Sequence, residues 1–93
     1  METENRVQYL RITNSKSTAL RLHLEPWGEQ FVMDPGTTFQ IVATGPEGDC
    51  MELEYDDEHI TLWGWSGSVI SIFHKGQKMG GSDIPMPDLP SGG

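Results

Sequence analysis

The segment from Leu20 to Ala43 alternates apolar and polar side chains with a period of two. The apolar parity of this segment comprises Leu20, Leu22, Leu24, Phe39, Ile41 and Ala43. A strand with one buried face produces this period, whereas a helix repeats every 3.6 residues. The segment therefore predicts β-strands that share one core.

Two breaks divide this segment into three strands at 20–25, 30–33 and 39–44. The first break is Glu25-Pro26-Trp27-Gly28, and the second is Asp34-Pro35-Gly36-Thr37. Proline followed by glycine is the signature of a type II turn, because glycine accepts the positive φ at the second central position. We expect the corner at 26–28 to carry the chain from one sheet to the other.

Further strands are predicted at 7–13, 50–55, 60–63 and 69–74, with a short return strand at Gln77 to Met79. We expect strand 7–13 to form an antiparallel hairpin with strand 20–25. In strand 50–55, Met51, Leu53 and Tyr55 are predicted to face the core. About seven short strands without a helix indicate an antiparallel β-sandwich of immunoglobulin-like or related Greek-key topology, and a small β-barrel is the alternative.

The length of 93 residues predicts one domain. We expect a flexible segment at 1–6, the sandwich at 7–79 and a disordered tail rich in glycine and proline at 80–93. The single cysteine, Cys50, excludes an internal disulfide and is expected to be a small buried side chain. No apolar run approaches the length of a membrane span, so we expect a cytoplasmic protein.

The formal net charge of −8 argues against binding to nucleic acid or to an anionic membrane. Half of the fourteen acidic residues lie within twelve positions: Glu47, Asp49, Glu52, Glu54, Asp56, Asp57 and Glu58. One interpretation is a solvated strand face whose charges prevent aggregation at a sheet edge. The other is a docking surface for a basic protein. The spacing does not match an EF-hand loop, so no metal site is predicted.

Three tryptophans form a second candidate surface. Trp27 lies at the corner at 26–28, and Trp63 and Trp65 share one parity near the end of strand 60–63. Tryptophans at these positions either fill the core or remain exposed as anchors of an interface or as a platform for a sugar ring. Both interpretations remain open from the sequence.

Catalysis and cofactor binding have little support. His23, His59 and His74 lie on separate predicted strands, and no spacing typical of a metal site accompanies them. The sequence lacks a nucleophile elbow and a glycine-rich loop between a strand and a helix. We predict that the protein is not an enzyme and needs no cofactor.

The motifs Glu25-Pro26-Trp27-Gly28, Asp34-Pro35-Gly36 and Trp63-Gly64-Trp65 resemble those of a group of short, uncharacterised bacterial all-β proteins. The resemblance covers about Val7 to Gly76. It implies the same order of strands and corners, and it implies no catalytic or cofactor residue.

These observations together predict a non-enzymatic protein-interaction module, with an acidic inhibitor or immunity-type protein as one concrete form. The alternative is a module that binds a small ligand or carbohydrate through exposed tryptophans. We also expect a weak homodimer that forms through an edge strand, for which 77–79 is the candidate.

Overall fold

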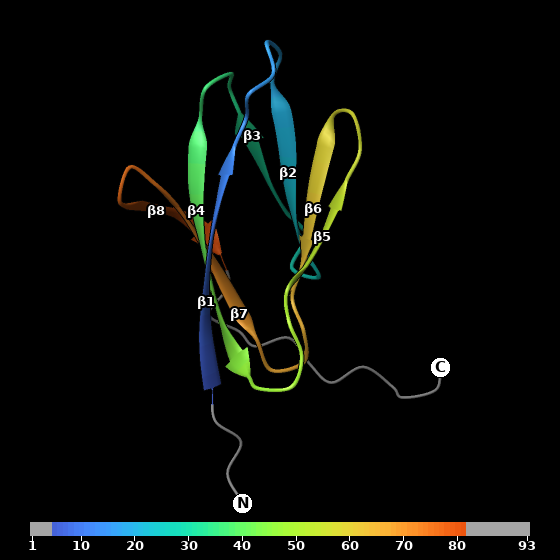
Figure 1. Cartoon of the computed structure of the whole chain (residues 1–93), viewed down its shortest axis with the longest axis vertical. Coiled ribbons are helices and arrows are strands. Elements are labelled where there is room, and N and C mark those ends of the chain that lie inside the picture. Colours follow the sequence, from blue (N-terminus) through green and yellow to red (C-terminus); the bar gives the residue numbers. More distant parts are fainter. Residues whose placement is uncertain (1–4, 82–93) are drawn as a thin grey trace, which may run out of the picture.

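The computed structural model describes residues 5–81, which form eight strands and no helix (Figure 1). The strands are β1 (Asn5–Thr13), β2 (Leu20–Glu25), β3 (Glu29–Met33), β4 (Thr38–Pro46), β5 (Glu52–Tyr55), β6 (His59–Trp63), β7 (Val69–His74) and β8 (Gln77–Gly81). Sheet A has the order β1-β4-β7-β8, and sheet B has the order β3-β2-β6-β5. The prediction of an all-β sandwich is confirmed, and neither sheet closes into a barrel.

The chain passes between the two sheets four times within the described residues. The connections 14–19 and 34–37 cross at one end of the molecule, and 47–51 and 64–68 cross at the other end (Figure 1). The three remaining connections are hairpin turns within one sheet. The four crossings therefore join the two sheets at both ends of the core.

One predicted pairing and one predicted crossing between the sheets are wrong. β1 pairs with β4 in sheet A and not with β2, while β2 forms its hairpin with β3 in sheet B. The corner at 26–28 is therefore a turn within sheet B and not a crossing between sheets. A three-residue connection suits a hairpin, whereas the crossings span the roughly 10 Å between stacked sheets.

The core lies between the inward faces of the two sheets. Its buried apolar residues are Ile12, Leu20, Leu22, Leu24, Met33, Phe39, Ile41, Ala43, Ile60, Leu62, Trp65, Ile70 and Ile72. The six apolar residues between Leu20 and Ala43 that were predicted to face the core all belong to this set. The period-two alternation therefore identified the inward face of β2 and β4 correctly.

Asn14 connects the two crossings at one end of the sandwich. Its backbone exchanges hydrogen bonds with Thr37 and Gly36, and its side-chain amide donates to the carbonyls of Thr18 and Met33 at 2.9 Å. Gly36 has φ of 83°, and the Thr37 N–H donates to the Asp34 carbonyl, as predicted for a type II turn. This fully satisfied buried side chain holds the connections 14–19 and 34–37 together.

β2 and β6 form the one parallel pair among the described strands. Their register places Glu25 beside Trp63 and Leu24 beside Leu62. The two leucines belong to the core, so the burial of this leucine pair fixes the register. The outward side chains of the same pair are consequently fixed as well.

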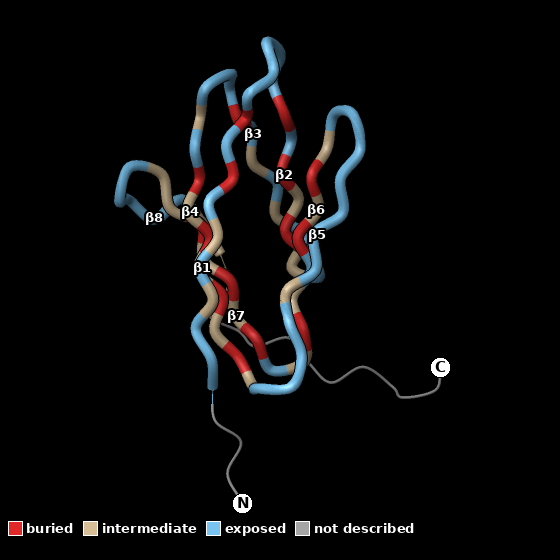
Figure 2. The backbone as a smooth tube through the Cα atoms, viewed as in Figure 1, coloured by how far each residue is buried: buried red, intermediate tan, exposed pale blue. Residues whose placement is uncertain are grey.

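β5 differs from the prediction. Leu53 and Tyr55 are 44% and 62% exposed, so these side chains do not belong to the core. β5 is one of the two edge strands of sheet B, and its whole length is exposed (Figure 2). An edge strand can therefore alternate apolar and polar side chains without burying the apolar ones. Only Met51, before the strand begins, packs partly against the core.

The strands extend slightly beyond the predicted domain limits. β1 begins at Asn5, and β8 ends at Gly81, so the predicted return strand at 77–79 is part of β8. The rest of the predicted flexible ends lies outside the described residues. Residues 5–81 contain no helix that could cross a membrane.

A matched pair of leucine substitutions tests the boundary of the core. Leu22→Ala should lower the free energy of unfolding by about 2 to 5 kcal/mol, because it opens a cavity at a fully buried position. Leu53→Ala should cost less than about 1 kcal/mol, because the side chain is already half in water. Urea denaturation followed by tryptophan fluorescence measures both values. Equal losses would show that β5 is covered.

Candidate functional site

Trp63 is the one exposed tryptophan among the described residues, and it lies between two carboxylates on the outer face of sheet B. The parallel pairing of β2 with β6 sets Glu25 opposite Trp63, and the antiparallel pairing of β5 with β6 sets Glu52 opposite it. Trp63 is 36% exposed, whereas Trp65 is 4% exposed. Glu54 lies on the same face, opposite Thr61. We call Trp63, Glu25, Glu52 and Glu54 the Trp63 face.

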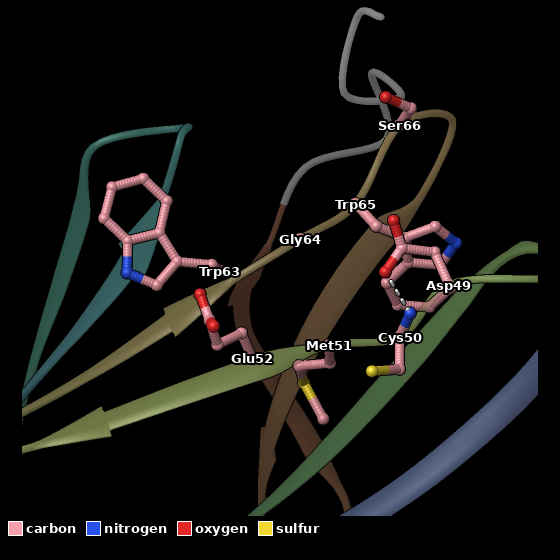
Figure 3. A pocket seen from close by; sticks show the side chains of 8 residues that line it. All are labelled: Asp49, Cys50, Met51, Glu52, Trp63, Gly64, Trp65 and Ser66. Carbon is pink, nitrogen blue, oxygen red and sulfur yellow. Dashed lines mark hydrogen bonds between the residues drawn. The ribbon is translucent and has the colours of Figure 1, made fainter. Parts of the chain in front are cut away.

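An open pocket of about 310 Å³ adjoins the Trp63 face. The residues that line it are Asp49, Cys50, Met51, Glu52, Trp63, Gly64, Trp65 and Ser66. In Figure 3, Trp63 and Glu52 lie on one side of the pocket, and Asp49, Cys50 and Trp65 lie on the other side. The pocket thus extends the Trp63 face toward the connection 47–51.

Trp65 is a structural residue. Its indole Nε1–H donates to the Pro46 carbonyl at 2.9 Å, and its backbone N–H donates to the Ser68 hydroxyl at 2.9 Å. The first bond fastens the crossing between β6 and β7 to the end of β4, and the second closes the turn within this crossing. The shared parity of Trp63 and Trp65 in the sequence has no structural meaning, because β6 ends at Trp63.

Trp27 also packs against the core at the β2–β3 turn. A Cβ atom added to Gly64 would lie 2.7 Å from the Trp27 ring, so glycine at this position permits the indole to approach the backbone. The Gly64 N–H donates to the Glu25 carbonyl at 3.0 Å. Trp27 therefore supports the end of β6 from which Trp63 projects.

The seven acidic residues of the predicted surface divide into three groups. Glu47 pairs with Arg6 at 3.0 Å, and Asp49 accepts a hydrogen bond from the Cys50 N–H, both in the connection between β4 and β5. Glu52 and Glu54 lie on the Trp63 face, and Asp56, Asp57 and Glu58 form the turn at the far end of β5. The acidic run is consequently not one continuous surface.

Asp56 stabilises the turn between β5 and β6. Its carboxylate accepts hydrogen bonds from the backbone N–H of Glu58 at 3.0 Å and of His59 at 2.9 Å. These two donors, together with the nearby His59 ring at 3.3 Å, hold the pKa of Asp56 below its ordinary value. Asp56 therefore has a structural role in the turn.

Two features of the outer face of sheet B were not predicted. Glu25 joins the Trp63 face only through the parallel pairing of β2 with β6, which no local sequence signal indicates. The same pairing brings the rings of His23 and His59 within 5.2 Å between centroids, although the sequence keeps them apart. His23 Nε2 is buried and has no hydrogen-bond partner among residues 5–81. The described residues hold no group of three side chains suited to a metal ion.

Cys50 is exposed, so the prediction of a buried cysteine is wrong. The residue lies in the connection that precedes β5, where no inward sheet face is available to cover its side chain. Its thiol faces the pocket beside the Trp63 face.

Comparisons with protein-family models, with curated proteins and with solved structures give no match to this chain.

The lowered pKa of Asp56 predicts a pH-dependent effect of Asp56→Ala. The carboxylate contributes its stability above the pKa of the unfolded chain and loses it as the pH falls through the lower folded pKa. Asp56→Ala should therefore destabilise the protein near neutral pH, and the difference from wild type should narrow in acid. Urea denaturation at a series of pH values measures this difference.

Asp57→Ala is the control for this measurement. It removes the same charge from the turn but leaves the two hydrogen bonds to the Asp56 carboxylate intact. An equal loss of stability in both variants would show that charge, and not hydrogen bonding, explains the effect.

Proposed function

We propose that this protein is a non-enzymatic interaction module that binds a basic segment of a partner protein through the Trp63 face. The observation that carries the proposal is the position of Trp63, which is exposed on the sheet with a carboxylate from each neighbouring strand beside it. Trp65 and Trp27 hold the end of β6 in place, so the exposed indole sits on a rigid support.

The chemistry of this surface suits a lysine or arginine side chain. A cation above an indole face gains a cation–π interaction of about 0.5 to 2 kcal/mol, and flanking carboxylates supply charged acceptors. Tryptophan is frequent among the residues that dominate binding energy at interfaces. Glu25 and Glu52 therefore supply charge on both sides of one aromatic anchor.

An acidic inhibitor or immunity-type protein remains the concrete form of this proposal. The net charge of −8 accelerates the encounter with a basic target, and the effect weakens as salt screens the charges. We also propose that the protein is located in the cytoplasm, because the exposed thiol of Cys50 suits a reducing compartment.

Charge reversal at the two flanking carboxylates tests the proposal. The double variant Glu25→Lys, Glu52→Lys should weaken binding of a lysine-rich peptide by about tenfold or more, since it removes both charged acceptors beside Trp63. Titration of the peptide into ¹⁵N-labelled protein, followed at the Trp63 indole N–H, gives the affinity and the location of binding.

The matched control is Asp34→Lys, Asp57→Lys, which changes the net charge equally at positions away from the Trp63 face. This control should bind the peptide more tightly than the Glu25 and Glu52 variant does. Equal weakening by the two double variants would mean that net charge alone attracts the peptide, and the proposal would then be wrong.

Small-ligand binding is a second candidate, favoured by the pocket of about 310 Å³ beside Trp63. A sugar ring that stacks on the indole should change the tryptophan fluorescence, and this change should disappear in Trp63→Ala. Titration with a panel of oligosaccharides measures it. A spectrum that no sugar changes would exclude the platform.

A further inference from the structure

β1 is a long edge strand with exposed apolar side chains. Its nine residues pair with β4 on one side, and no other described strand pairs with its outer side. Val7 is 51% exposed, and Tyr9 is 70% exposed. An edge strand of this length presents a row of backbone donors and acceptors to which another strand can bind.

Charge is distributed unequally between the two sheets. The four strands of sheet A, all within the described residues, contain no aspartate or glutamate, and they carry Arg6, Arg11 and Lys78. Sheet B carries Glu25, Glu29, Glu52 and Glu54 on its strands, against the single basic residue Arg21. A chain with a net charge of −8 repels its own copies, and this repulsion is weakest where sheet A meets sheet A.

We infer that β1 pairs antiparallel with β1 of a second copy, so that two copies of sheet A become one eight-stranded sheet. The inference does not depend on the Trp63 face, which lies on the other sheet. Association through one pair of identical strands about a two-fold axis produces a closed dimer and leaves both Trp63 faces free.

The strand Asn5–Thr13 sets the register when it overlaps fully with its copy. Tyr9 is the midpoint and lies opposite Tyr9 of the second copy, and Arg11 lies opposite Val7 of the second copy. Directly opposed Cβ atoms in such a pair are about 4.5 to 5.5 Å apart, and long side chains also reach diagonal neighbours. Arg11 can therefore contact the Tyr9 ring of the second copy and add a cation–π interaction.

The other edges are less suited to this pairing. β8, the edge expected from the sequence, is irregular because its pairing with β7 shifts register between Ile72 and Phe73, and Gly81 has φ of 125°. β5 has four residues, of which Glu52 and Glu54 would face like charges. β3 has five residues and begins with Glu29. Irregular, short and charged edges are the devices that prevent pairing.

Disulfide trapping tests the inference at the proposed midpoint. In a Cys50→Ser background, Tyr9→Cys should form a cross-linked dimer of twice 10.4 kDa under mild oxidation, because opposed cysteines in this register meet disulfide geometry. Val32→Cys on β3 and Met79→Cys on β8 are exposed controls on other edges. The yield from Tyr9→Cys should exceed both several-fold. Equal yields, or a higher yield from Met79→Cys, would overturn the inference.

Sedimentation of the protein without introduced cysteines provides the second measurement. The mass of wild type should rise with concentration from 10.4 kDa toward twice that value, whereas Tyr9→Glu should remain at 10.4 kDa. Val32→Glu places the same charge on an exposed valine of β3 and should behave as wild type does. A wild-type mass that stays at 10.4 kDa at every concentration would overturn the inference.

Discussion

The parallel pairing of β2 with β6 is the constraint on which the candidate site depends. Burial of Leu24 and Leu62 on its inner face fixes the register, and the same register brings Glu25 next to Trp63 on the outer face. β5 then adds Glu52 from the opposite side. A shift of one residue would move Trp63 into the core and remove its indole from the outer face.

The two sheets present surfaces of different chemistry. Sheet B has its exposed tryptophan among carboxylates, while sheet A has exposed apolar side chains and no acidic residue on its strands. The proposed binding of a basic partner and the inferred association of identical copies would therefore use opposite layers of the sandwich. Both can occur together, because neither surface overlaps the other.

The sequence predicted the strands and the inward residues of β2 and β4 because alternation records which side of a strand is buried. It did not predict strand neighbours, since alternation is equally satisfied by many pairings. Leu53 was misassigned for a related reason: β5 alternates, but Leu53 and Tyr55 stay exposed among the described residues. Trp63 and Glu52 were identified as site candidates from their residue types. Glu25 was not, because only a contact between distant strands brings it to Trp63.

The most direct test of the account is the solvent exposure of the three indole N–H groups, measured in one ¹⁵N-correlated spectrum with a soluble paramagnetic agent. The structure predicts that the Trp63 signal is broadened most strongly, and that the Trp65 signal, whose N–H is bonded to the Pro46 carbonyl, is protected. A protected Trp63 or a strongly broadened Trp65 would contradict the position of the exposed indole.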